Sequence, residues 1–137
     1  MKQKVCSLKE TEALANQFAA SLKAGDAVVL HGDLGAGKTT FTQFVFKSLG
    51  VKESVTSPTF SILKTYQGKF TLHHFDAYRI TTEEAIEAGF DEILSQPDSV
   101  KFIEWSENIA ALLPKKLIKV NIEYVDENTR TFEITHE

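Results

Sequence analysis

Hydrophobic positions in the first third of the chain follow a helical period, then a short continuous run, then a helical period again. Apolar residues at every fourth position from Leu14 to Leu22 predict an amphipathic helix over about residues 8–23. Ser7 and Glu10 have the spacing of a capping box at its start. The next segments predict a buried strand at 27–30, a glycine-rich loop, and a second helix with apolar positions between 41 and 49.

Strand-like patterns dominate the rest of the chain. Gly68 separates two runs rich in β-branched and aromatic residues, and polar residues 126–128 separate two alternating runs, so each pair predicts a hairpin. The expected strands are 60–66, 70–75, 100–105, 117–124 and 131–134, with short helices near 82–88 and 106–113. This order is typical of an α/β protein. We expect one domain over residues 1–137, with a mainly parallel sheet flanked by helices and a C-terminal β-hairpin.

Composition and charge narrow the possible functions. The 137 residues are 42% hydrophobic and 25% charged, which is typical of a folded globular chain rather than a disordered one. The net charge is −4 and only two residues are arginines, which argues against a protein that binds nucleic acid by itself. One cysteine cannot form an internal disulfide. No apolar run approaches the roughly 20 residues that span a membrane, so a cytoplasmic location is expected.

The glycine-rich loop carries the strongest chemical signal. Residues 32–39 match the pattern G-x-x-x-x-G-K-[ST] in full, between an expected strand and an expected helix. Glycines let successive backbone N–H groups face an anion, and the helix N-terminus adds partial positive charge. Lys38 would reach the β- and γ-phosphates of a nucleoside triphosphate, and the Thr39 hydroxyl would bind Mg²⁺. The residues expected to contact the nucleotide here are Asp33, Leu34, Gly35, Ala36, Gly37, Lys38, Thr39 and Thr40.

Hydrolysis of a nucleotide also needs an acidic residue for Mg²⁺ and a group that positions the attacking water. Glu104 follows the apolar strand residues 100–103, and Asp76 follows Phe75 at the end of another expected strand. Each could instead be a solvated carboxylate just beyond a strand. His74 lies in the same polar cluster as Asp76 and could be an ordinary hydrogen-bonded histidine.

Two further features have two interpretations each. The segment 56–60 lies where phosphate-sensing proteins have a switch loop, so Thr59 could sense the γ-phosphate, but a simple proline-containing turn fits equally well. Trp105 could be a core residue or a surface for a partner, and its place directly after Glu104 favours a role in the site or an interface.

Together, these motifs resemble the bacterial TsaE (YjeE) family over nearly the whole chain. The resemblance rests on the loop at 32–40, the Ser57-Pro58-Thr59-Phe60 segment, the block His74-Phe75-Asp76-Ala77-Tyr78-Arg79, and Glu104-Trp105. It implies an ATPase subunit of the machinery that makes N6-threonylcarbamoyladenosine at position 37 of certain tRNAs. In that family the partner is a TsaB–TsaD heterodimer, and TsaD transfers the threonylcarbamoyl group, so tRNA would be met only indirectly.

The resemblance also implies residue roles and cofactors. ATP and Mg²⁺ would be bound by Lys38 and Thr39, with Glu104 as the acidic Mg²⁺ residue and Asp76 as the carboxylate essential to hydrolysis. Thr59 would be switch-like. Arg130 would lie near the nucleotide, although Thr129 precedes it where the family often has glycine. Arg79, or a residue of the partner, could stabilise charge on the transferred phosphate.

Three other functions remain to be weighed. A small P-loop kinase usually needs a lid with arginines, and this chain has two arginines and little room for a lid. A GTPase would carry an N-K-x-D pattern, which is absent from the sequence. A nucleotide-dependent binding switch with negligible hydrolysis of its own overlaps with the family interpretation, since partner docking could complete the site.

Overall fold

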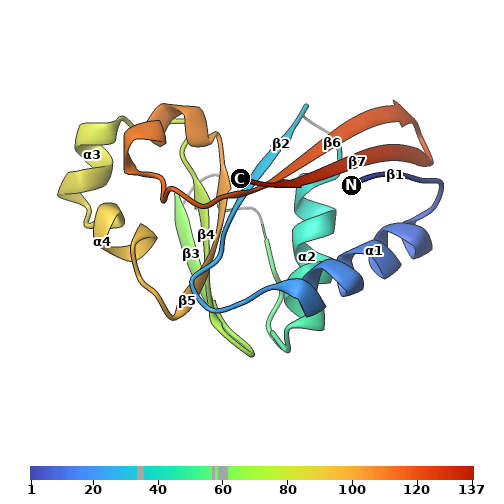
Figure 1. Ribbon diagram of the computed structural model, residues 1–137, viewed down its shortest axis with the longest axis horizontal. Helices are drawn as coiled ribbons and strands as arrows, with labels where there is room; N and C mark the ends of the chain where they lie inside the picture. The colour runs from blue at the N-terminus through green and yellow to red at the C-terminus, as the bar shows by residue number, and fades with distance from the viewer. Residues whose placement is uncertain (34–35, 57, 59–61) are drawn as a thin grey trace.

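The computed structural model describes residues 1–33, 36–56, 58 and 62–137. Within them, one sheet contains the strands β1 (Lys2–Val5), β2 (Ala27–Gly32), β3 (Leu63–Gln67), β4 (Thr71–Asp76), β5 (Ser99–Glu104), β6 (Ile118–Asp126) and β7 (Thr129–His136). The helices are α1 (Leu8–Ser21), α2 (Lys38–Ser48), α3 (Thr82–Glu87), α4 (Phe90–Leu94) and the 3-10 helix η1 (Ser106–Leu112). Figure 1 shows their arrangement.

The strand order is β1-β7-β6-β2-β5-β4-β3. The four central strands, from β6 to β4, pair in parallel, and the three outer pairings are antiparallel. The α/β class, the flanking helices and the C-terminal β-hairpin are confirmed. The expected parallel sheet corresponds to the centre, and the hairpins at both sides make the whole sheet mixed.

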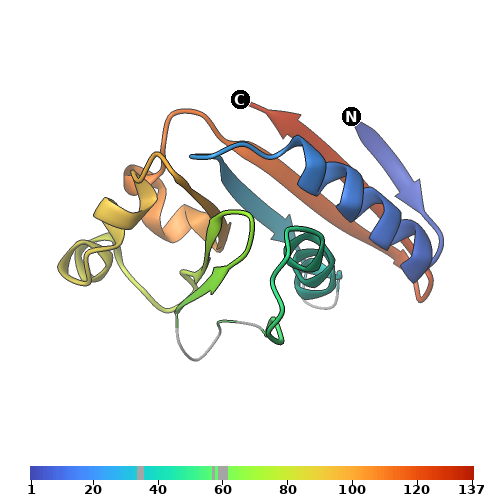
Figure 2. The same cartoon turned by 90° about the horizontal axis from the view of Figure 1, so that it is seen from below.

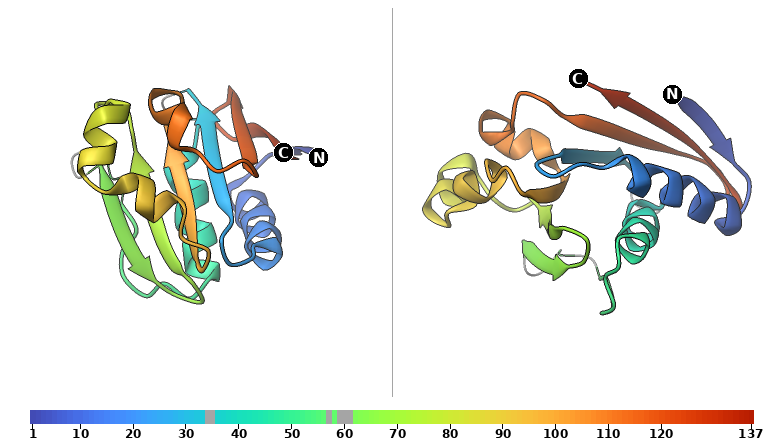
Figure 3. Two further views of the ribbon diagram at one scale, coloured as in Figure 1. Left: turned by 60° about the vertical axis from the view of Figure 1, so that its left-hand side comes forward. Right: turned by 60° about the horizontal axis from the view of Figure 1, so that its bottom comes forward.

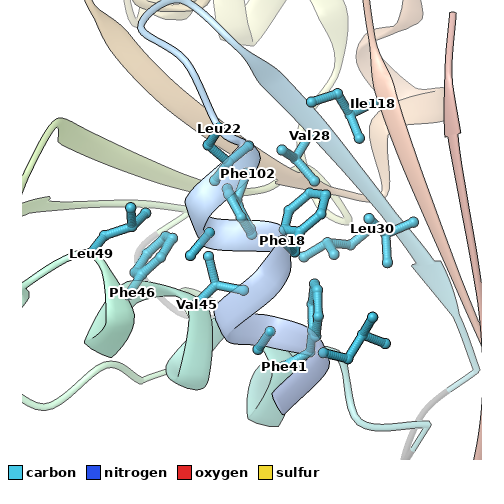
Figure 4. Close-up of a cluster of buried hydrophobic side chains, with 14 of the residues drawn as sticks. Phe18, Leu22, Val28, Leu30, Phe41, Val45, Phe46, Leu49, Phe102 and Ile118 are labelled. Atoms are coloured by element: carbon cyan, nitrogen blue, oxygen red, sulfur yellow. The ribbon is translucent and has the colours of Figure 1, made fainter. Parts of the chain in front are cut away.

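Two helices cover one face of the sheet. α1 and α2 lie side by side against it (Figures 2 and 3). An aromatic cluster fills the space between, with the Phe46 and Phe102 rings 5.0 Å apart and the Phe18 and Phe41 rings 5.5 Å apart (Figure 4). Burial of such large apolar surfaces is the main stabilising contribution to the fold, and here it fixes α2 on the sheet.

The opposite face is covered by α3, α4 and η1. Because strand side chains alternate, β5 supplies Phe102 to the larger core and Ile103 to a second, smaller cluster. Phe75 of β4 joins Ile103 there, packed against Ala85 of α3 and Leu94 of α4. β5 is buried along its whole length, as its apolar sequence predicted.

Local signals predicted several helix ends. The Ser7 hydroxyl accepts from the Glu10 backbone N–H, as expected, but the Glu10 side chain accepts from the Cys6 N–H rather than from Ser7, so the capping box predicted there is only half formed. Thr81 and Glu84 form the other expected capping box in full. β1 and α4 were not predicted, and the segment after Trp105 is a 3-10 helix with a non-helical Ile109. None of the described helices is long and apolar enough to cross a membrane.

Candidate functional site

The glycine-rich loop joins the central strand β2 to the start of α2. Gly37 precedes α2 with φ +107°, a conformation that L side chains rarely adopt. A Cβ on Gly32 would lie 2.8 Å from the Ile122 carbonyl oxygen, so no side chain fits there. The Ala36 N–H donates to the Asp33 carbonyl at 2.9 Å. The described loop residues on the C-terminal side therefore lead directly into the N-terminus of α2, a place that favours anion binding.

Two predicted residues meet at this point. Nζ of Lys38 lies 3.6 Å from Oε1 of Glu104, and both side chains are mostly buried. Oε2 of the same carboxylate accepts a hydrogen bond from Nε2 of His74 at 2.8 Å. Because β2 and β5 are neighbouring parallel strands, their carboxyl ends bring the loop and Glu104 together.

The charge of Glu104 is set by these neighbours. Burial alone would raise the pKa of Glu104, but its interactions with His74, and after them those with Lys38, outweigh this effect and hold the pKa below its ordinary range. Glu104 is therefore an ionised carboxylate at neutral pH, the form that binds a metal ion.

Asp76 is the register partner of Glu104 across the parallel β4–β5 pair, so the two carboxylate side chains leave the same face of the sheet. Oδ1 of Asp76 accepts from the Tyr78 backbone N–H at 3.0 Å. The Ala77 N–H donates to the Glu104 carbonyl at 3.0 Å, which ties the loop after β4 to the end of β5. The structure thus brings Asp76 next to the Lys38–Glu104 pair.

Asn108 holds the loop after β4 from the other side. Its side-chain amide donates to the carbonyls of Ala77 at 2.8 Å and Tyr78 at 3.2 Å. The Thr82 hydroxyl donates in turn to the Asn108 carbonyl. Asn108 was not predicted as a site residue, because only the folded chain places η1 against this loop.

Trp105 turns sharply out of β5 with φ +58°, a left-handed conformation that costs a non-glycine residue of order 1–3 kcal/mol. Its ring lies 5.3 Å from Nζ of Lys38 and packs against the Tyr78 ring in a tilted arrangement, with centroids 4.8 Å apart. Trp105 is 43% exposed and Tyr78 is 55% exposed. Trp105 is therefore a surface residue that partly covers the lysine, not a core residue.

The two arginines differ in their contacts. Nε of Arg130 donates to the Ala36 carbonyl at 3.0 Å, and its guanidinium lies 4.5 Å from the Tyr124 ring centroid. Arg130 thus fastens the β6–β7 hairpin to the glycine-rich loop. Arg79 is exposed beside a hollow lined by Thr82 and Asn108. Within the described chain, no ion pair joins Arg79 to Glu104.

The remaining predicted residues fall into two groups. Thr39 and Thr40 lie in the first turn of α2, and Asp33 is exposed just before the undescribed part of the loop. A cavity beside the loop is lined by Ser7, Thr11, Gly37, Thr40, Asn128 and Arg130. Leu34, Gly35 and Thr59 lie outside the described residues.

Comparison with known proteins agrees with the motifs. Residues 5–132 match the family model described as "Threonylcarbamoyl adenosine biosynthesis protein TsaE". The chain is 45% identical to the tRNA threonylcarbamoyladenosine biosynthesis protein TsaE of Rickettsia bellii, covering 96% of this chain and 92% of that protein. It is 38% identical to the protein of the same name from Bacillus subtilis, covering 98% and 85%.

A solved structure has the same fold. The crystal structure of YdiB from Bacillus subtilis superposes with a TM-score of 0.82 and 34% sequence identity, covering 99% of this chain and 84% of that one.

Proposed function

Since the chain belongs to the TsaE family of threonylcarbamoyl adenosine biosynthesis proteins, we propose that it binds and hydrolyses ATP in that pathway. It would be the ATPase subunit of the bacterial complex that forms N6-threonylcarbamoyladenosine at position 37 of tRNAs. Its turnover would support the TsaB–TsaD transferase. The cytoplasmic location expected from the sequence suits this role and stays a prediction.

The observation that carries the proposal is the ion pair between Lys38 and Glu104 at 3.6 Å. A magnesium–nucleotide complex requires two charges from the protein, a cation for the phosphates and a carboxylate for the metal. Here the lysine begins the helix that follows the glycine-rich loop, and the carboxylate ends β5, the parallel neighbour of β2. Lys38 would bind the β- and γ-phosphates through charge-assisted hydrogen bonds. Glu104 would hold the metal, directly or through water.

The donor set suits Mg²⁺, which prefers hard oxygen ligands and keeps several waters. The hydroxyl of Thr39 is in the first turn of α2, and the carboxylate of Glu104 is kept ionised by its neighbours. When bound, Mg²⁺ neutralises charge on the phosphate oxygens. The phosphates themselves would lie against the backbone N–H groups of the loop and the N-terminus of α2.

We assign Asp76 to the attacking water. One of its oxygens is held by the Tyr78 backbone N–H, which fixes the carboxylate beside Glu104. Such a fixed acceptor can orient a water for in-line attack on the γ-phosphorus, with ADP as the leaving group. Separate roles for Glu104 and Asp76 explain why two carboxylates end neighbouring strands.

Arg130 suits a supporting role on the nucleotide side. Its side chain contacts the Ala36 carbonyl and lines the cavity shared with Gly37 and Thr40. Thr59 is assigned a switch-like role on the family resemblance alone.

A TsaB–TsaD partner would meet the chain near the phosphates. Tyr78 and Trp105 form an exposed aromatic pair, and the Trp105 ring lies beside Lys38. Aromatic residues of this kind often anchor protein interfaces. With a net charge of −4, the chain suits contact with protein and nucleotide, while tRNA would be held by other subunits.

One observation favours a second candidate, a nucleotide-dependent binding switch with little hydrolysis of its own. In the described chain, Arg130 is engaged with backbone carbonyls and Arg79 has no ion pair to Glu104. A group that stabilises charge on the transferred phosphate would then come from the partner. Hydrolysis by the isolated chain would be slow.

Steady-state ATP hydrolysis, measured for the chain alone and with TsaB–TsaD, tests the proposal. We expect slow turnover alone and marked stimulation by the pair, together with modified adenosine in tRNA. ATP binding without hydrolysis in either condition would favour the binding switch. A phosphorylated small molecule in place of free phosphate would favour a kinase.

A further inference from the structure

His74 supplies a buried hydrogen bond that none of the roles assigned above uses. Its ring is fully buried on β4, and Nε2 lies 2.8 Å from Oε2 of Glu104. The other oxygen, Oε1, faces the ammonium group of Lys38. The carboxylate therefore divides its two oxygens between a partner inside the protein and a partner at the start of α2.

The hydrogen of this bond belongs to the histidine. Because a carboxylate oxygen can only accept, Nε2 must carry the hydrogen of the 2.8 Å contact with Oε2. Among the described residues, Nδ1 of His74 is buried with no hydrogen-bond partner. A hydrogen on Nδ1 would be a buried donor without an acceptor, which is costly, so we assign the ring to the Nε2–H tautomer.

Packing fixes the position of the ring. Phe46 meets His74 edge-on, with ring centroids 6.0 Å apart. Phe46 and Lys38 are both on α2, about two turns apart. α2 therefore contacts both members of the pair: Phe46 packs against His74, and Lys38 lies beside Glu104.

We propose that His74 is a positioning residue that fixes the carboxylate of Glu104, so that Oε1 stays directed toward the phosphates and the metal ion. An unrestrained glutamate loses rotamer freedom each time it binds a ligand. A histidine that already holds Oε2 restricts the glutamate before the ligand binds, so most of this entropy is not lost on binding. The inference rests on the proposed function, since it concerns the same magnesium–nucleotide site.

Two substitutions separate positioning from packing. His74→Phe keeps an aromatic ring but removes the donor, whereas His74→Gln has an amide that can donate to Oε2. We would measure the Mg²⁺ concentration for half-maximal ATP hydrolysis with TsaB–TsaD, and ADP affinity in EDTA. His74→Phe should raise the Mg²⁺ requirement about 10- to 100-fold with metal-free affinity unchanged, and His74→Gln should restore most of the loss. A normal Mg²⁺ requirement in His74→Phe, or equal losses in both variants, would overturn the inference.

The tautomer gives a readout that needs no hydrolysis. Nitrogen-15 NMR of the wild-type chain should show a hydrogen on Nε2 of His74 and none on Nδ1, with shifts that change in Glu104→Gln. A hydrogen on Nδ1 together with normal ATP hydrolysis would overturn the role of His74 alone. The expected tautomer in a chain that binds no ATP would overturn the proposed function, and with it the metal role of His74.

Discussion

Nζ of Lys38, the first residue of α2, lies 3.6 Å from Oε1 of Glu104, the last residue of β5. Without nucleotide, each of these charges is the counterion of the other. A magnesium–nucleotide complex would offer phosphate oxygens to the lysine and a metal ion to the carboxylate. Both mostly buried charges would remain paired after this exchange, which avoids the cost of an unpaired buried charge.

Glu104→Gln should slow ATP hydrolysis by two to three powers of ten, roughly the loss seen when one group that stabilises transition-state charge is removed. ADP affinity in EDTA should be unchanged or higher, since the carboxylate repels phosphates. Turnover rates and calorimetry would measure the two effects. Glu107→Gln, in the exposed part of η1, is the matched control. Normal turnover in Glu104→Gln would contradict its assigned role.

Asp76→Asn should leave MgATP affinity close to that of the wild type and reduce the hydrolysis rate, by about 100-fold or more. The amide oxygen can still accept from the Tyr78 N–H, so the loop should keep its shape. Single-turnover hydrolysis with TsaB–TsaD present would measure the chemical step. Asp91→Asn in the outer helix α4 serves as the control. Lost affinity with an unchanged single-turnover rate would argue for a binding role instead.

The lowered pKa of Glu104 makes a prediction about stability and pH. A carboxyl whose pKa is lower in the folded chain stabilises the fold fully above its ordinary pKa, near 4.5, and this contribution is lost as the pH falls through the lower folded value. Urea unfolding of wild type and Glu104→Gln from pH 7 to pH 3 would measure it. The difference in unfolding free energy between the two proteins should be constant above about pH 5. Below that pH, the wild type should lose stability relative to Glu104→Gln. A constant difference down to pH 3 would mean that Glu104 is not held ionised by its neighbours.

Asn108→Ala should lower the free energy of unfolding by about 1 kcal/mol, the usual contribution of partly exposed hydrogen bonds. It should also slow hydrolysis, because the Asn108 amide holds the loop between Asp76 and Arg79 through the Ala77 and Tyr78 carbonyls. Urea unfolding and turnover would check both effects. Asn121→Ala, at an exposed position on β6, should change neither. Unchanged hydrolysis in Asn108→Ala would show that the loop keeps its shape without this contact.

Local patterns made much of the fold predictable. The β2–loop–α2 unit, the N-cap at Ser7, the capping box at Thr81 and the two hairpins each depend on neighbouring residues in the sequence. β1 was not predicted, because Lys2, Gln3 and Lys4 are exposed polar residues that give no hydrophobic pattern. Its strand structure depends on pairing with β7.

The site was predictable as a set of residue types, but not as a set of contacts. The loop motif identified Lys38, and the strand ends identified Asp76 and Glu104. The burial of His74 against Glu104 depends on the register of β4 against β5, and the Arg130–Ala36 contact joins residues 94 positions apart in the sequence. Such long-range pairings leave no local pattern in the sequence.

Equilibrium binding of ATP in the presence of Mg²⁺ to the wild-type chain and to Lys38→Ala tests the central claim most directly. Lys47→Ala, at the exposed C-terminal end of the same helix, is the matched control. We predict that wild type and Lys47→Ala bind ATP alike, that GTP competes weakly, and that Lys38→Ala loses at least about 100-fold in affinity, as expected for a charge-assisted phosphate contact. Equal ATP affinity in Lys38→Ala and wild type would contradict the nucleotide site proposed for this chain.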